Sequence, residues 1–167
     1  MLIDRTAIIS DCGRYRYLLR RLWAEGLPRA LFIMLNPSTA DDKIDDPTIK
    51  ALIRWCQHHS YGSFEVVNIF AVRSSDPIAI YQIGDPVGPR NEGVIGRALD
   101  RADIVICAWG AHLSARDHVS GLMRQIRSKK EHVFCLGVTK LGAPRHPLYI
   151  AANQPLIEFS PRKEFRP

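Results

Sequence analysis

The chain has 167 residues, of which 46% are hydrophobic and 24% are charged. These proportions are typical of a globular domain and exclude a disordered chain, and no apolar run approaches the roughly 20 residues of a membrane-spanning helix. The net charge of +6 permits a polyanionic partner but does not by itself indicate one, because many basic domains bind no nucleic acid.

Two features of the sequence bear on cellular location. Asp4 and Arg5 lie where a secretory signal peptide would need its apolar segment. The four cysteines are scattered, and two of them fall in strand-like apolar runs: Cys12, Cys56, Cys107 and Cys135. This usage favours reduced, buried thiols over disulfides. We therefore expect a cytoplasmic protein that does not associate with a membrane.

The first predicted element is an antiparallel hairpin over residues 6–23, TAIISDCGRYRYLLRRLW. Its two apolar halves are separated by Cys12-Gly13, and glycine suits a tight turn between strands. We expect the hairpin to add edge strands to a sheet.

Four further apolar runs predict buried strands at 30–35, 64–70, 103–109 and 132–137. They are short and nearly continuous, which is typical of strands covered on both faces. Apolar residues at helical spacing lie between consecutive runs, in 49–56, 94–102 and 119–126. This order predicts an α/β fold, a three-layer sandwich with a central parallel sheet of about four strands, helices on both faces and the hairpin at the edge.

The carboxyl ends of the four runs carry the candidate site residues, because ligands of open parallel sheets bind beyond those ends. The candidates are Asn36, Ser38 and Thr39 after the first run, Asn68 and Arg73 at the second, Trp109 at the third, and Lys140, Arg145 and His146 after the fourth. We expect Asn36, Asn68, Trp109 and His146 to face one cleft. The turn-rich segment 73–93 is long enough to be functional.

Each of the main candidates also has a purely structural interpretation. Asn36-Pro37 could simply end a strand, since the residue before proline avoids helical conformation. Asn68 lies inside the apolar stretch VVNIF, where its amide must find partners. Those partners are as readily a neighbouring loop's backbone as a ligand. His146 has the sequence context of an ordinary loop histidine.

Other site chemistries have weaker support. The stretch CQHH at 56–59 has no second cluster at metal-ligand spacing, and Cys56 also belongs to a helical stripe. The segment GVTKLG at 137–142 lacks the order of a phosphate-binding Walker loop, and neither a GxSxG nor a GxGxxG motif occurs. We expect no metal or organic cofactor.

Several ordered motifs resemble one bacterial family. CGRYRYLLRRLW, FIMLNPSTADD, DDPTIK, YGSFEVVNIFAVRSSDP, GDPVGPRNE, ICAWGAH and CLGVTKLGAPRHPLY together identify the chain as a member of domain of unknown function 1643. The resemblance covers about residues 10–157. The length of the chain predicts a single domain over 1–167, and its last residues, 158–167, form a basic tail. The family name states no activity.

The order of these motifs is also similar, more distantly, to the uracil-DNA glycosylase superfamily. That resemblance implies that Asn36, in MLNPS, positions a water molecule, and that Asn68, in VVNIFAV, reads the amide edge of a base. It implies that His146, in RHPLY, stabilises the departing base, and it aligns Trp109-Gly110 with a tryptophan-glycine pair of the superfamily. The Ser-Pro that follows His-Pro in those enzymes is absent here, and Leu35 replaces a glycine.

The resemblance leads to an expected function with two alternatives. The expected activity is hydrolysis of the N-glycosidic bond of a modified base, with DNA or a nucleotide-like small molecule as partner and with Asn36 and His146 as catalytic residues. The first alternative is a hydrolase or transferase of a free nucleotide or modified nucleoside, with Arg73, Lys140 and Arg145 holding a phosphate. The second is a module that binds a base or nucleotide without chemistry.

Overall fold

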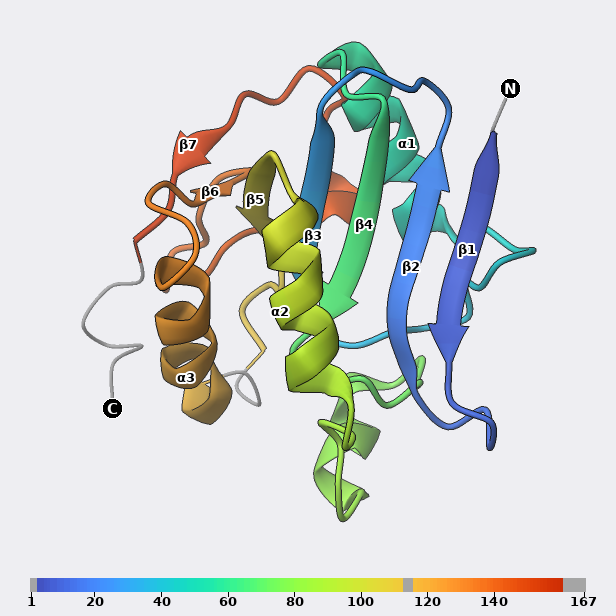
Figure 1. The fold of residues 1–167 in the computed structure, drawn as a ribbon. Helices are drawn as coiled ribbons and strands as arrows, with labels where there is room; N and C mark the ends of the chain where they lie inside the picture. The colour runs from blue at the N-terminus through green and yellow to red at the C-terminus, as the bar shows by residue number, and fades with distance from the viewer. Residues whose placement is uncertain (1–2, 113–115, 161–167) are drawn as a thin grey trace.

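The computed structural model describes residues 3–112 and 116–160, drawn as a ribbon in Figure 1. Its elements, in chain order, are β1 (Asp4–Ile9), β2 (Arg16–Leu22), β3 (Arg29–Met34), α1 (Pro47–His58), β4 (Ser63–Asn68), the 3₁₀ helix η1 (Pro77–Gln82), α2 (Asn91–Arg101), β5 (Ile104–Cys107), α3 (Arg116–Arg127), β6 (Phe134–Cys135), the 3₁₀ helix η3 (Pro147–Tyr149) and β7 (Ile157–Glu158). In this described part of the chain the longest helices, α1 and α3, have 12 residues each, and no helix could cross a membrane.

The described strands form one sheet in the order β1-β2-β4-β3-β5-β6-β7. The four predicted runs do pair in parallel, β4 with β3, β3 with β5 and β5 with β6. The predicted sheet of about four strands is too small, however, because seven strands take part. Strand β2 of the N-terminal hairpin pairs antiparallel with β4, and β7 pairs antiparallel with β6. Both edges of the parallel segment are therefore covered, which satisfies backbone groups that an edge strand would expose.

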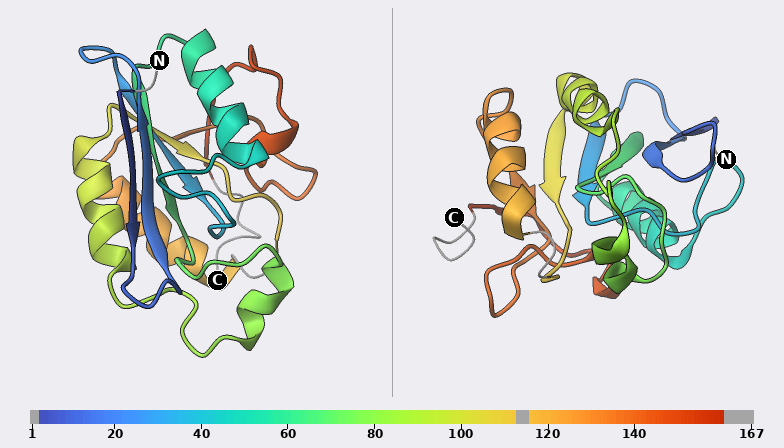
Figure 2. Two further views of the ribbon diagram at one scale, coloured as in Figure 1. Left: turned by 90° about the vertical axis from the view of Figure 1, so that its right-hand side faces the viewer. Right: turned by 90° about the horizontal axis from the view of Figure 1, so that it is seen from below.

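Helices cover both faces of the sheet, as the sequence predicts (Figure 2). Helix α1 packs on one face, in a cluster that includes Phe32, Leu52 and Phe64. Helices α2 and α3 pack on the other, in a cluster that includes Ile33, Leu99 and Ile126. The start of helix α1 is capped, since the Asp46 carboxylate accepts a hydrogen bond from the Ile49 amide at 2.8 Å and Pro47 occupies the first turn.

Strand alternation decides which residues face α1. Successive side chains of a strand point to opposite faces, and β3 pairs with β4 so that Phe32 lies opposite Val66 and Met34 opposite Asn68. Phe32, Met34 and Val66 all belong to the cluster under α1. Asn68 therefore points to the α1 face, at the end of its strand.

The loop between β3 and α1 is held against the hairpin by buried arginines. Arg21 is fully buried, and its Nε donates to Asp45 Oδ1 at 2.9 Å. A second guanidinium nitrogen of Arg21 donates to the Asp41 carbonyl oxygen and to the same carboxylate. Arg16 Nη1 donates to the Ala40 carbonyl oxygen at 2.7 Å. Because each buried charge needs these partners, the hairpin fixes the course of the loop.

The segment 73–93 is more ordered than its composition suggests. It contains η1, whose first turn is capped by the Asp76 carboxylate accepting from the Ile78 amide at 2.9 Å. Its later part returns to the sheet, where the Ala71 amide donates to the Val87 carbonyl oxygen at 3.2 Å. The segment therefore packs back against the end of β4.

We predict that Asp45→Ala lowers the free energy of unfolding by about 3 kcal/mol, because it leaves the buried Arg21 guanidinium without its counter-ion. Urea denaturation at pH 7 measures this. The matched control is Asp42→Ala, which removes an exposed carboxylate from the same loop and should change stability by less than about 0.5 kcal/mol. Equal effects of the two substitutions would contradict this role for Asp45.

Candidate functional site

A small polar cavity lies beyond the ends of β3 and β4, on the α1 face. Its volume is about 60 Å³, several times the space that one water molecule needs. Its polar lining comes from five separate segments and consists of Arg16, Asn36, Ser38, Asp46, Thr48, Asn68 and His146. Four of these were candidates from the sequence: Asn36, Ser38, Asn68 and His146.

Asn68 is buried, with 2% of its surface exposed, and its Oδ1 has no hydrogen-bond partner among the described residues. In the described structure, no loop backbone group donates a hydrogen bond to this oxygen, so the purely structural interpretation of Asn68 does not account for it. A buried acceptor without a partner is costly, and such atoms in native proteins call for a ligand, a water molecule or a functional reason. Asn68 thus offers an acceptor to the cavity.

Asn36 continues the alternation of β3 past Met34 and so points to the same face as Asn68. Its Nδ2 donates to the Ser74 carbonyl oxygen at 2.8 Å and to its neighbour Pro37's carbonyl oxygen at 3.1 Å. The Asn36 amide therefore ties together the loops that follow β3 and β4. The Nδ2 group of Asn36 makes both of these hydrogen bonds, and its Oδ1 can accept a further hydrogen bond.

Arg16 completes the cavity and was not singled out from the sequence. It is 3% exposed, and its Nε has no partner in the described part of the chain. Burial lowers the pKa of Arg16 to about 10, an effect that the nearby Asp46 carboxylate opposes. The guanidinium remains charged at neutral pH. Arg16 and Asn68 thus line one cavity, and each has a buried polar atom without a partner among the described residues: the donor Nε–H of Arg16 and the acceptor Oδ1 of Asn68.

His146 lies at the other side of the cavity. Its Nδ1 accepts a hydrogen bond from the Leu148 amide at 3.3 Å, so in the neutral imidazole the proton is on Nε2. Burial lowers the pKa of His146, and the Asp46 carboxylate partly offsets this. The ring is therefore neutral at pH 7, with Nε2–H as a donor.

A wider pocket of about 320 Å³ shares His146 with the cavity. Gly110, Thr139, Arg145 and Tyr149 contribute to its lining, and the Tyr149 side chain is 88% exposed. Gly110 has a φ of +78°, and a Cβ there would lie 3.7 Å from the His146 Cβ. The glycine allows the backbone turn that brings β5 beside His146.

Trp109 does not face the cavity, contrary to the sequence-based expectation. Val105, Cys107 and Trp109 alternate onto the face covered by α2 and α3. The Trp109 ring packs edge-on against Phe159, with 5.6 Å between ring centroids. Trp109 follows β5 and continues the alternation of Val105 and Cys107. Its indole therefore enters the core under α2 and α3, although the tryptophan-glycine motif lies at the predicted strand end.

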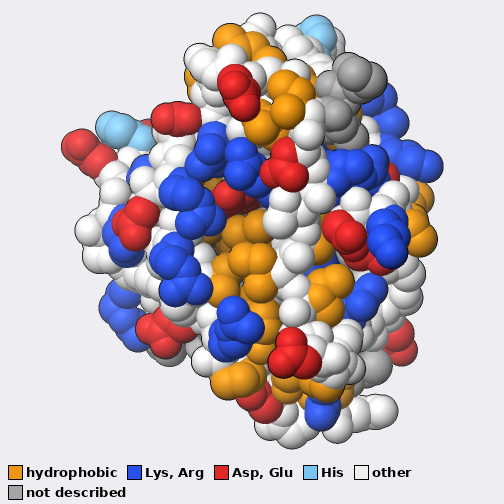
Figure 3. Space-filling view, turned by 45° about the vertical axis from the view of Figure 1, so that its right-hand side comes forward, with side chains coloured by type: hydrophobic (Ala, Val, Ile, Leu, Met, Phe, Trp, Pro, Cys, Tyr) orange, Lys and Arg blue, Asp and Glu red, His pale blue; other side chains and the backbone are white. Residues whose placement is uncertain are grey.

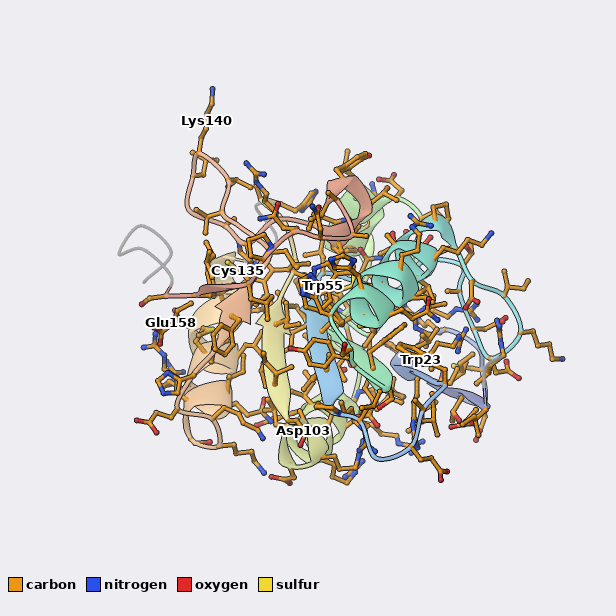
Figure 4. All side chains as sticks on the ribbon, turned by 90° about the horizontal axis from the view of Figure 1, so that it is seen from above. Trp23, Trp55, Asp103, Cys135, Lys140 and Glu158 are labelled. Carbon is orange, nitrogen blue, oxygen red and sulfur yellow. The ribbon has the colours of Figure 1, made fainter. Side chains whose placement is uncertain are left out.

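The remaining candidate residues do not line the polar cavity. Thr39 is exposed and absent from its lining. Lys140 projects into solvent from the tip of its loop (Figure 4). Arg145 is exposed and lines the wider pocket, while Arg73 Nη1 donates to the Gly13 carbonyl oxygen at 3.5 Å. Of the predicted phosphate contacts, only Arg145 therefore lines either pocket.

Within residues 3–112 and 116–160, no group of three or more His, Cys, Asp or Glu side chains could hold a metal ion.

The comparisons with known proteins identify the family of the chain. A family model described as Protein of unknown function (DUF1643) matches residues 16–148, so the chain belongs to this family. Searches of the curated proteins and of the solved structures found no match. The matched segment begins with Arg16 and contains every polar residue that lines the cavity.

We predict that NMR titration gives His146 a pKa below the ordinary 6.5. The unfolded chain then binds the proton more readily than the folded one, so His146 reduces stability as the pH falls through 6.5 and below. Asp46→Asn should lower this pKa further, because it removes the carboxylate charge while asparagine still caps α1. Asp42→Asn, an exposed control, should leave it unchanged. A His146 pKa above 6.5 would contradict this description of the cavity.

Proposed function

We propose that this member of the DUF1643 family binds a nucleobase through the polar cavity and hydrolyses its N-glycosidic bond. The observation that carries the proposal is the pair of unpartnered atoms, Arg16 Nε and Asn68 Oδ1, in a cavity that also contains Asn36 and His146. The distant similarity of motif order to uracil-DNA glycosylases supports the same assignment of roles.

The cavity suits the hydrogen-bonding edge of a base. A ring N–H donates to Asn68 Oδ1, and a neighbouring carbonyl oxygen accepts from Arg16 Nε–H, so that both buried groups gain partners. About 60 Å³ accommodates this edge and not a whole nucleoside. The rest of the base and the sugar occupy the wider pocket, where the exposed Tyr149 ring can stack on the base.

The proposed reaction uses Asn36 and His146. Asn36 Oδ1 accepts a hydrogen bond from water and directs the water oxygen to C1′ of the sugar. The C1′–O bond forms as the C1′–N bond breaks, and the electron pair leaves with the base. His146 Nε2–H stabilises that charge. The water loses one proton to solvent and the base gains one. Since an amide is a weak base, the chemistry suits a labile, modified base.

The substrate can be polymeric or free. A base in duplex DNA would have to leave the helix to reach the cavity. Figure 3 shows Lys and Arg side chains beside an apolar strip, interspersed with acidic residues. In the basic stretch from Arg124 to Lys130, Lys129 pairs with Asp100, and Lys130 donates to the Ala102 carbonyl oxygen. These lysines hold α3 in place, which gives little support to that stretch as a phosphate-binding surface.

Base release tests the proposal. The protein is incubated with oligonucleotides that carry a panel of modified bases and, in parallel, with the corresponding free nucleosides, and mass spectrometry measures the released base. Release from the oligonucleotide alone identifies a nucleic-acid substrate, and release from the nucleoside alone identifies the free form. Binding with no release by either substrate would favour the module without chemistry, and neither binding nor release would contradict the proposal.

We predict that leucine substitutions at two buried asparagines change the stability of the protein differently. Asn68→Leu should abolish base binding yet leave the melting temperature unchanged or higher, because it removes a buried acceptor without a partner. The control is Asn91→Leu. It should cost about 1–3 kcal/mol, because Asn91 Nδ2 donates to two carbonyl oxygens, those of Asn68 at 2.9 Å and Ile69 at 3.0 Å. Thermal unfolding and isothermal titration with the released base measure these effects. A strongly destabilised Asn68→Leu protein would show that the amide is structural.

A further inference from the structure

A second pocket lies on the opposite face of the sheet, between α2 and α3. Its volume is about 540 Å³, within the range of small-molecule sites. Ile69 and Val87 line it from the loops, Ile95 from α2 and Leu122 from α3. It shares no lining residue with the polar cavity or the wider pocket, so it is a separate site.

Asn91, in the first turn of α2, is the buried polar residue of this pocket. It is 1% exposed and its Oδ1 has no partner among the described residues. The orientation of the amide is fixed by chemistry, because its nitrogen lies 2.9 Å from the Asn68 carbonyl oxygen and 3.0 Å from that of Ile69. A flipped amide would set its oxygen against two carbonyl oxygens. Oδ1 is therefore a fixed acceptor in need of a donor.

The rest of the lining defines the charge and polarity of a ligand. Four of the lining side chains are aliphatic, which favours a largely apolar molecule. The charged lining residues are one anion, Glu92, and one cation, Arg124, and His118 and Gln125 are the other polar side chains beside Asn91. Their formal charges balance, which favours a neutral molecule. Gln125 Nε2 donates to the Glu92 carbonyl oxygen at 3.0 Å and so links the two helices beside the pocket.

We propose that this pocket binds a neutral, largely apolar small molecule that donates one N–H or O–H hydrogen bond to Asn91 Oδ1. The donor satisfies the one buried polar atom of the pocket that lacks a partner in the described chain, and the apolar body covers the aliphatic side chains. The site is separate from the polar cavity, because it lies on the other face of the sheet and shares no lining residue with it.

Gly121 provides a way to block the pocket without harming the fold. It lies in the middle of α3 and lines the pocket, and a Cβ there would meet only the end of the Arg124 side chain, at 3.8 Å. Replacing a helical glycine favours the helix. Gly121→Leu should therefore fill part of the pocket in a folded protein, and Gly121→Ala is the matched control that leaves most of the space.

Indole is a suitable probe, because it is neutral, apolar and carries one N–H donor. Its control is benzofuran, which has nearly the same shape and no donor. In ¹H–¹⁵N NMR titrations of the whole protein, indole should shift the amide signals of Ile69, Ile95 and Leu122. Benzofuran should bind about fivefold more weakly, the loss expected for one hydrogen bond. Gly121→Leu should weaken indole binding at least about tenfold, and Gly121→Ala should retain it.

Three results would overturn the proposal. The first is an absence of indole-induced shifts at these amides, and the second is equal affinity for indole and benzofuran. The third is full indole binding by Gly121→Leu once thermal unfolding shows that this variant is folded. Shifts confined to Gly110, Thr139 and Tyr149 would place indole in the wider pocket and would also count against the site.

Discussion

The pairing of the hairpin arginines with the loop after β3 is the constraint on which the candidate site depends. Arg21 is a fully buried cation, and two of its partners, Asp41 and Asp45, lie in this loop. Arg16 is held by the same loop through the Ala40 carbonyl oxygen. The loop then runs directly into Asp46, which caps α1 and carries charge beside Arg16 and His146. The hairpin is thus part of the cavity wall as well as an edge of the sheet.

Strand alternation divides the chemistry of the protein between two faces. Asn68 directs its side chain to the α1 face, while its carbonyl oxygen accepts from Asn91 at the start of α2. Each of these buried asparagines keeps an oxygen without a partner in the described chain. A fold gains no stability from such atoms. Their presence on both sides of one strand end is the strongest physical sign that this region contacts ligands.

Much of the fold could be predicted from apolar periodicity. Continuous Val, Ile and Phe runs identified the parallel strands, and apolar residues at helical spacing over 49–56 identified α1. The short strand β7 could not be predicted, because two residues, Ile157–Glu158, are too few to show the apolar alternation of a strand. They pair with β6 through backbone hydrogen bonds, which do not depend on side-chain type. The number of strands in the sheet was therefore underestimated. The sequence also did not show that β2 pairs directly with β4.

The candidate site was predicted in part. Asn36, Asn68 and His146 come together because parallel strands end at one rim. Trp109 was misplaced because the motif was read without strand parity. Arg16 was not predicted as a site residue, since a charged residue gives no sign of burial until the loop that neutralises it is placed. Both interpretations of Asn36 apply, because its amide nitrogen ties two loops together and its oxygen remains an acceptor.

The central claim is that Arg16 Nε and Asn68 Oδ1 together recognise the amide edge of a base. A crystal structure of the protein soaked with uracil, the simplest base that has such an edge, tests it most directly. The account predicts a ring N–H within about 3.2 Å of Asn68 Oδ1 and a carbonyl oxygen within the same distance of Arg16 Nε. Ordered water in the cavity, with uracil absent or bound only beside Tyr149, would contradict it.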